Sequence, residues 1–301
     1  MTISDPGFAR TFGLLLAVAW TCNGTAKENW NNPPKEKVQG VEHATFRSAS
    51  MKVDVGFNIY LPPQYAGENQ QRFPVIYYLH GIKGNESSYL DYARLLDHAI
   101  KSGAVRPIIL VFANGGETSF FSDSPDRTVM GETVVIRELI PHIDQHFRTI
   151  GSPTARSVHG FSMGGFGALK FAFKYPDLFG SVVSYGAILP DAKTFAKKES
   201  KIFEKAFGNE AGFAANDPFS LLDQNSSKLQ SAKIQIVIGS EDELMPVNRK
   251  LHVALGRLQI QHQFRALPGV PHKKEPLYDK AAQGAFEFTS KSFDGPANPG
   301  K

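Results

Sequence analysis

The chain has 301 residues, of which 42% are hydrophobic and 21% are charged, and its formal net charge is +4. This is an ordinary globular composition, and the length allows one large α/β domain or two small ones. Basic residues form no run longer than two and are not interleaved with aromatic residues, which argues against a nucleic-acid partner. The only cysteine is Cys22, so a disulfide within the chain is excluded and a thiol nucleophile is disfavoured.

The first 26 residues have the pattern of a secretory signal peptide. Arg10 precedes a short apolar run over 12–20, which small and polar residues follow, and the run is too short to span a bilayer. Cleavage after Ala19 or after Ala26 would satisfy the small-residue rule. Asp5 is atypical of the region that precedes the apolar run in a signal peptide. The alternative to a signal peptide is a buried or membrane-lying N-terminal helix. We expect a secreted or periplasmic protein with no membrane span in its mature form.

Residues 27–40 are polar, contain two adjacent prolines and predict an extended linker. Two strands are predicted next, over 41–50 and 51–61, and a short turn joins them into a hairpin. In the second strand apolar residues alternate with polar ones and glycine, so one face should be buried. The continuous apolar run over 73–79 predicts a strand at the centre of a sheet that is covered on both faces.

Helices and strands alternate along the rest of the chain. Helices are predicted over 87–101, 131–147, 163–174, 246–258 and 281–293, and strands over 107–113, 157–161, 179–186, 233–238 and 260–267. Pro141 should bend or break the second of these helices. Residues 188–231 are less regular, with a helix over 193–207 and a turn at 218–223, and we interpret them as an insertion that could cap a site. The Gly/Pro-rich tail over 294–301 is predicted to be disordered.

This alternation predicts one α/β catalytic domain over 41–293, with a mostly parallel central sheet and helices on both faces. In such sheets ligands bind at the carboxyl ends of the strands. Four predicted strands end in suggestive loops, which begin at His80, Ser162, Gly239 and Pro268. The fold should bring these four loops together.

The stretch Gly160-Phe161-Ser162-Met163-Gly164-Gly165 lies between a predicted strand and a predicted helix. A serine with glycines two residues away on each side is the nucleophile-elbow pattern. A strand that turns directly into a helix forces its central residue into a strained conformation, and the residues two away must be small. The alternative is a glycine-rich turn with an incidental serine.

A serine hydroxyl needs a base to remove its proton, and that base is a histidine held by a carboxylate. The α/β-hydrolase order is serine, acid, histidine. Ser162, Asp242 and His272 follow that order, each soon after a predicted strand. Glu241, Asp242 and Glu243 are consecutive, so Glu243 remains an alternative to Asp242 as the acid.

The oxyanion of the transition state needs two backbone N–H donors. Met163, the residue after the nucleophile, should provide one, and Ile82 should provide the other. The side chain of His80 should only hold its loop through a backbone hydrogen bond. His142 and His146 have metal-ligand spacing, but the glutamate of a zincin helix is absent, so we expect a surface helix face, no metal and no cofactor.

With these residues assembled, the chain resembles the esterase D-like branch of the α/β-hydrolases. That branch includes feruloyl and acetyl-xylan esterases, enterochelin esterases, S-formylglutathione hydrolases and mycolyltransferases. The matching stretches are Tyr-Leu-His-Gly-Ile (78–82), Glu-Leu-Ile-Pro-His-Ile-Asp (138–144), Gly-Phe-Ser-Met-Gly-Gly-Phe-Gly-Ala-Leu (160–169), Tyr-Pro-Asp-Leu-Phe (175–179) and Gly-Ser-Glu-Asp (239–242).

The resemblance implies an α/β-hydrolase fold, a triad of Ser162, Asp242 and His272, and an oxyanion hole of Ile82 and Met163. Two departures stand out. Many relatives carry Gly-Gly-His-Asp near the histidine, where this chain has Gly-Val-Pro-His-Lys-Lys. Mycolyltransferases place a glutamate one residue later in the acid loop, which corresponds to Glu243.

These features predict a serine carboxylesterase that works through an acyl-enzyme, on a small-molecule or carbohydrate-linked ester such as an acyl or feruloyl ester. Acyl transfer to a sugar needs the same triad and stays open. A cytosolic S-formylglutathione hydrolase is disfavoured by the signal-like N-terminus and by Phe166, where those enzymes tend to have histidine. A non-catalytic binding module on the same fold is disfavoured by the complete triad.

Overall fold

The computed structural model describes residues 29–67 and 70–293. The predicted signal peptide over 1–26 and the predicted disordered tail over 294–301 lie outside the described residues. Among the helices in the two described ranges, none is both long enough and apolar enough to cross a membrane.

One eight-stranded sheet forms the centre of the described structure, with the strand order β1-β2-β4-β3-β5-β6-β7-β8. The strands are β1 Val41–Arg47, β2 Asp54–Tyr60, β3 Val75–Leu79, β4 Ile109–Ala113, β5 Arg156–Phe161, β6 Ser181–Tyr185, β7 Lys233–Gly239 and β8 His262–Leu267. Strand β2 runs antiparallel to β1 and β4, and all other neighbouring strands are parallel. The predicted hairpin and the mostly parallel sheet are both confirmed.

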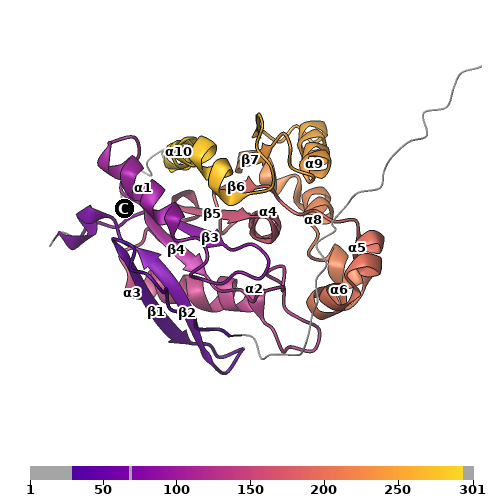
Figure 1. Ribbon diagram of the computed structural model, residues 1–301, viewed down its shortest axis with the longest axis horizontal. Helices are drawn as coiled ribbons and strands as arrows, with labels where there is room; N and C mark the ends of the chain where they lie inside the picture. The colour runs from indigo at the N-terminus through magenta and orange to yellow at the C-terminus, as the bar shows by residue number, and fades with distance from the viewer. Residues whose placement is uncertain (1–28, 68–69, 294–301) are drawn as a thin grey trace, which may run out of the picture.

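Helices cover both faces of this sheet (Figure 1). The α-helices of the described residues are α1 Asp91–Lys101, α2 Gly131–Thr133, α3 Ile140–His146, α4 Met163–Lys174, α5 Ala192–Lys198, α6 Ser200–Phe207, α7 Glu210–Ala214, α8 Pro218–Asn225, α9 Met245–Arg257 and α10 Lys274–Ser292. Helices α1 and α10 pack together on one face, where an apolar cluster includes Leu96 and Phe286. Helices α3, α4 and α9 contribute to the cluster on the other face, which includes Ile143, Leu169 and Leu251. This is the layered α/β-hydrolase arrangement that the sequence predicted.

The register of the parallel strands places their carboxyl ends at one edge of the sheet. Leu79 pairs with Gly160, and Phe161 pairs with Tyr185. Gly239 pairs with Leu267 in β7 and β8, the last pair of strands in the sheet. The loops that follow β3, β5, β6, β7 and β8 therefore leave the sheet on the same side, as expected for a ligand site in this kind of fold.

The final helix begins seven residues earlier than predicted, because α10 begins at Lys274 and the prediction began at 281. Pro276 lies in the first turn of α10, where a proline is tolerated because the backbone N–H groups there need no partner within the helix. Leu277 and Tyr278 are buried against the sheet, and this burial anchors the additional turns.

The predicted break at Pro141 corresponds to a change in helix type. Val134–Leu139 form a π-helix, and the N–H of Ile140 donates to the carbonyl of Val135, five residues back. Helix α3 then begins with Pro141 in its first turn. A proline inside an α-helix lacks one donor and its ring collides with the carbonyl four residues back, and a wider turn just before it accommodates both effects.

The insertion over 188–231 forms four short helices, α5 to α8, and not the one helix and one turn that we predicted. The predicted helix over 193–207 is split at Glu199, which leaves the helical region. The predicted turn at Pro218 is the start of α8, whose first turn is capped by the Asp217 carboxylate accepting the N–H of Ser220 at 3.0 Å. The role of this insertion as a cap stays a prediction.

The described part of the predicted linker, residues 29–40, contains no helix or strand, but it packs onto the domain. Trp30 is buried in the apolar core, and its carbonyl accepts the N–H of Gly56 at 2.6 Å. The Asn32 side chain donates to the buried Glu86 carboxylate at 3.1 Å. The absence of helix and strand in these residues is compatible with the predicted extended linker, whose role as a linker stays a prediction. A tryptophan and a buried carboxylate hold the segment against the domain.

Candidate active site

Ser162 stands at the turn between β5 and α4 with φ of 59° and ψ of −113°. A positive φ is unfavourable for a residue with a side chain, and it persists only where the surrounding structure holds it. Here the N–H of Ser162 donates to the carbonyl of Tyr185 at 2.9 Å, and the carbonyl of Ser162 accepts the N–H of Ile188 at 3.2 Å. The end of β6 thus fixes the strained residue.

The two flanking glycines are required by space at this turn. A Cβ on Gly160 would lie 2.1 Å from the carbonyl oxygen of Gly164. A Cβ on Gly164 would lie 2.0 Å from the carbonyl oxygen of Leu79 and 2.7 Å from that of His80. No side chain fits at either position, so the steric argument for the elbow holds, and the first turn of α4 lies directly against the end of β3.

Ser162, His272 and Asp242 form a continuous line of hydrogen-bonding side chains. The Nε2 of His272 lies 3.0 Å from the Oγ of Ser162. The Nδ1 of His272 lies 2.7 Å from the Oδ2 of Asp242. The three residues follow β5, β8 and β7, so the sheet brings together groups that are up to 110 residues apart in sequence. A neutral imidazole here can donate to the carboxylate through Nδ1 and accept the serine proton at Nε2.

The structure distinguishes the three consecutive acidic residues after β7. Asp242 is buried, and its second oxygen, Oδ1, accepts the N–H of Leu244 at 2.8 Å. Glu241 and Glu243 are exposed. Asp242 is therefore the carboxylate placed to orient His272, and Glu243 is not in contact with it.

Two further residues enclose the imidazole of His272, and the sequence prediction did not single out either of them for this position. The ring of Phe161 stacks on that of His272, with centroids 4.8 Å apart and an interplanar angle of 24°. Gly186, with φ of +51°, lies on another side, where a Cβ would be 3.1 Å from Asp242 Oδ2 and 3.3 Å from the imidazole. The sequence offered one signal for these contacts with His272: Phe161 directly precedes Ser162, and Gly186 directly follows β6.

The two predicted oxyanion donors lie on adjacent segments. Met163 is the first residue of α4 and is buried. Ile82 is partly buried in the loop that follows β3. A Cβ on Gly81 would lie 3.5 Å from the carbonyl oxygen of Phe161, so the loop backbone runs beside the residue that precedes the nucleophile. The two backbone segments therefore lie side by side, and the role of their N–H groups as oxyanion donors stays a prediction.

His80 is buried and holds its own loop, in agreement with the prediction. Its Nδ1 lies 2.8 Å from the carbonyl oxygen of Gly81, and its Nε2 accepts the N–H of Gly115 at 3.4 Å. Burial lowers the pKa of His80 to about 4, because the charged imidazolium is poorly solvated there. His80 is therefore neutral at physiological pH and connects the loops that follow β3 and β4.

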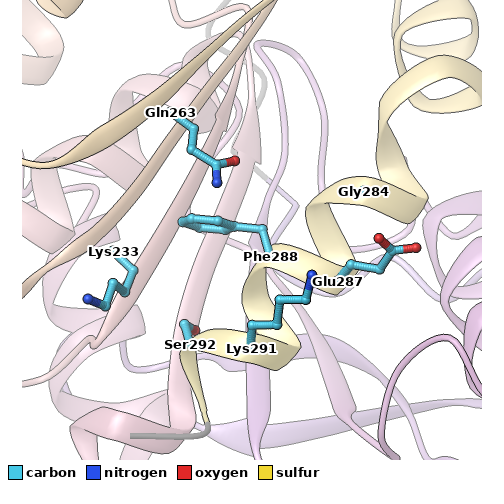
Figure 2. A pocket seen from close by; sticks show the side chains of 7 residues that line it. All are labelled: Lys233, Gln263, Gly284, Glu287, Phe288, Lys291 and Ser292. Atoms are coloured by element: carbon cyan, nitrogen blue, oxygen red, sulfur yellow. The ribbon is translucent and has the colours of Figure 1, made fainter.

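The other features considered for chemistry lie away from the triad. The rings of His142 and His146 stack 4.1 Å apart on α3, and no group of three potential metal ligands occurs among residues 29–67 and 70–293. A surface hollow of about 360 Å³ lies between α10 and the amino ends of β7 and β8, with the Phe288 ring reaching from the helix toward the strands (Figure 2). Its lining residues are Lys233, Gln263, Gly284, Glu287, Phe288, Lys291 and Ser292. It lies at the opposite edge of the sheet from Ser162.

Comparisons with known proteins find similarity to esterases. A curated esterase of Mycobacterium tuberculosis is 28% identical over 254 residues, which cover 74% of this chain and 54% of the relative. An endo-1,4-beta-xylanase/feruloyl esterase of Xylanibacter ruminicola is 32% identical over 173 residues, covering 54% of this chain and 24% of the relative. The chain thus spans about half the length of the first relative and about a quarter of the second.

A solved ferulic acid esterase superposes with a TM-score of 0.73 at 22% identity, covering 84% of this chain and 98% of that one. This likeness shows a shared fold. A family model described as "Putative esterase" matches residues 48–278, which include Ser162, Asp242 and His272. Because that match extends over well more than half of the sequence, the chain belongs to this esterase family of α/β-hydrolase fold.

Proposed function

We propose that the protein is a serine carboxylesterase that hydrolyses its substrate through an acyl-enzyme intermediate. The observation that carries this proposal is the pair of hydrogen bonds that links Ser162 to His272 and His272 to Asp242, at 3.0 and 2.7 Å. Both lie within the range in which a base can take a proton from a nucleophile and be oriented by a third group.

In the acylation step, Ser162 Oγ attacks the ester carbonyl carbon while His272 Nε2 takes the hydroxyl proton. The resulting oxyanion is stabilised by the N–H groups of Met163 and Ile82. The C–O bond to the alcohol then breaks, and His272 returns its proton to the leaving alkoxide. Asp242 keeps Nδ1 protonated, so that Nε2 is free to act as the base, and it stabilises the imidazolium that forms.

In the deacylation step, a water molecule takes the place of the alcohol. His272 removes a proton from this water as it attacks the acyl carbonyl, and the second tetrahedral intermediate uses the same two N–H donors. When it collapses, Ser162 regains its proton from His272 and the carboxylic acid is released. The donors at Met163 and Ile82 should each contribute about 10²- to 10³-fold to the rate, as oxyanion donors do elsewhere.

For the substrate, we propose a carbohydrate-linked acyl or feruloyl ester. The support is the likeness to the xylanase/feruloyl esterase and to the ferulic acid esterase described above. The ring of Tyr89 is partly exposed and lies 6.1 Å from that of the buried Phe161, centroid to centroid, so it provides aromatic surface near the triad that suits an aromatic acyl group. The apolar run over 12–20 supports export of the protein from the cytoplasm. A carbohydrate-linked ester that belongs to a polysaccharide would be found outside the cell.

The role of Ser162 is tested with the Ser162→Ala variant and a short p-nitrophenyl ester. We expect turnover to fall by at least 10⁴-fold, because the acyl-enzyme can no longer form. The matched control is Ser227→Ala, an exposed serine, which should keep full activity. Turnover by Ser162→Ala at the wild-type rate would overturn the proposal.

Substrate class and acceptor are tested on the wild-type protein. Rates for acetyl, butyryl and feruloyl esters of the same sugar should be highest for the feruloyl compound. Product analysis in the presence of excess free sugar separates hydrolysis from acyl transfer, since a transferase would form a new sugar ester and little free acid. Preference for the acetyl ester would contradict the feruloyl assignment and leave the esterase assignment intact.

A further inference from the structure

A buried ion pair lies behind the elbow helix. Lys170 of α4 has no exposed surface, and its Nζ lies 2.6 Å from the Oε2 of Glu132. The same ammonium donates to the carbonyl of Phe121 at 2.7 Å and to the Oγ of Ser122 at 2.9 Å. Lysine is rarely fully buried, and a buried charge is strongly unfavourable unless every partner is present. This ammonium therefore has a defined set of acceptors within the long loop after β4.

The carbonyl that Lys170 holds belongs to a strained turn. Phe120 and Phe121 both have φ of +53°, a region that residues with side chains rarely adopt. Two consecutive residues of this kind persist only where the surroundings hold them. The Lys170 ammonium on the Phe121 carbonyl and the Ser119 hydroxyl, which accepts the Phe121 N–H at 2.9 Å, provide two such contacts.

The ring of Phe121 is wedged between the elbow helix and the loops at the strand ends. A Cβ on Gly115 would lie 2.3 Å from this ring, and a Cβ on Gly167 of α4 would lie 2.6 Å from it. The ring also lies 5.0 Å from the imidazole of His80, centroid to centroid. Because His80 in turn bonds to the carbonyl of Gly81, a chain of contacts runs from Lys170 to the loop that carries Ile82.

We propose that Lys170 is a positioning residue for the oxyanion hole, which acts through Phe121 and His80 to hold the Ile82 N–H at its place beside Ser162. This inference rests on the proposed esterase function. Removal of the ammonium would let the Phe120–Phe121 turn relax to an ordinary conformation. The Phe121 ring would then shift away from His80, and the loop over 80–83 would lose its support.

Both members of the ion pair are mostly charged at pH 7. Burial lowers the pKa of Lys170 to about 8, and the Glu132 carboxylate opposes this effect. Burial would raise the pKa of Glu132, but the ammonium groups of Lys170 and Lys174 outweigh it and lower that pKa to about 2. Lys174 contacts the same carboxylate at 2.8 Å and is partly exposed, and its ammonium donates to Glu132 and Asn216, not to the Phe121 carbonyl, which makes it a matched control.

The test compares Lys170→Met with Lys174→Met. For Lys170→Met we expect kcat to fall 10- to 100-fold with KM within twofold, because the donor acts on the transition state and not on the bound ester. The inhibition constant of a trifluoromethyl ketone, whose adduct oxygen occupies the oxyanion position, should rise by a similar factor. Lys170→Arg should recover part of the loss, and Lys174→Met should match wild type in all three values.

Amide hydrogen exchange provides a readout that does not depend on turnover. Exchange in residues 80–84 should accelerate in Lys170→Met and stay unchanged in Lys174→Met. If Lys170→Met fails to fold because Glu132 loses its buried partner and keeps only Lys174 and Tyr175, the double variant Lys170→Met/Glu132→Gln and the variant Phe121→Leu test the same chain of contacts. Both should reproduce the fall in kcat.

The inference is overturned if a folded Lys170→Met or double variant keeps the wild-type kcat and inhibitor affinity, or if Lys174→Met loses as much. These outcomes are separable from a failure of the proposed function. An inactive Ser162→Ala together with a fully active Lys170→Met would reject only the positioning role, whereas an active Ser162→Ala would reject the serine mechanism itself.

Discussion

Asp242 shows how one side chain among three similar neighbours becomes the partner of His272. Both of its carboxylate oxygens are engaged, one by His272 at 2.7 Å and the other by the N–H of Leu244 at 2.8 Å. The backbone contact fixes the carboxylate before substrate binds, so no reorganisation is needed when the imidazolium forms. Glu243 is next in sequence, but its side chain points to solvent.

At this scale we predict that Asp242→Asn lowers kcat by about 10³- to 10⁴-fold with little change in KM, because an amide does not stabilise the required tautomer or the imidazolium. Hydrolysis of a p-nitrophenyl ester measures the effect. Glu243→Gln is the matched control and should stay within twofold of wild type. A loss in Glu243→Gln as large as that in Asp242→Asn would show that the acid has been assigned to the wrong residue.

Helix α4 runs from Ser162, the proposed nucleophile, into the interior of the domain. Its first turn lies against the end of β3, and its last two turns carry Lys170 and Lys174, which both contact Glu132. The hydroxyl of Tyr175 also donates to this carboxylate. One buried carboxylate thus connects the carboxyl end of α4 to the start of the helical segment over 131–146, and its charge should contribute to the stability of the domain.

The pH dependence of stability tests this contribution. The folded-state pKa of Glu132 is about 2, below its usual value near 4.5, so its contribution is fully present above about pH 4.5 and is lost as the pH falls toward 2. We predict that Glu132→Gln lowers the free energy of unfolding by about 3 kcal/mol at pH 7, since it leaves a buried ammonium unpaired. Urea unfolding at pH 7, 5 and 3 should show this difference narrowing below pH 4.5.

The exposed Glu204 of α6 provides the control for that series. Glu204→Gln should change the free energy of unfolding by less than about 0.5 kcal/mol at every pH, because the group is solvated in both states. A difference between wild type and Glu132→Gln that stays constant from pH 7 to pH 3 would contradict the electrostatic interpretation.

At the scale of the whole molecule, the domain extends beyond the sheet and its helices into the irregular segment over 29–40. Trp30 packs into the larger apolar cluster, and the backbone N–H and side chain of Asn32 both contact Glu86. Glu86 also accepts from the Asn114 side chain at 2.7 Å, in the loop directly after β4. The segment over 29–40 thus packs against the domain, and through Glu86 and Asn114 it contacts the edge of the sheet at which Ser162 lies.

We predict that Trp30→Ala lowers the free energy of unfolding by about 3–5 kcal/mol, the range for truncating a large buried aromatic side chain. Urea denaturation followed by far-ultraviolet circular dichroism measures this change. Lys35→Ala, an exposed position in the same segment, should have no measurable effect. Equal stability of Trp30→Ala and wild type would mean that the segment does not belong to the folding unit.

Local sequence was sufficient to predict the turn at Ser162, the chain order of Ser162, Asp242 and His272, and the class of fold. The elbow is predictable because the collisions that exclude a Cβ at Gly160 and Gly164 arise within one strand-turn-helix unit and at its contact with β3. The alternation of strands and helices is a short-range periodic signal, and it places Ser162, Asp242 and His272 at one edge of a parallel sheet.

Long-range packing settled the rest. Asp242 and Glu243 have nearly the same local sequence, and only the approach of the loop after β8 determines which carboxylate meets His272. Lysine is a residue type that is usually exposed, and Lys170 is buried by a loop nearly fifty residues earlier in the chain. The docking of Trp30 and the early start of α10 likewise depend on distant surfaces. Such contacts cannot be predicted from the local sequence, because each depends on a segment that is distant in the chain and packs against the residue in the folded structure.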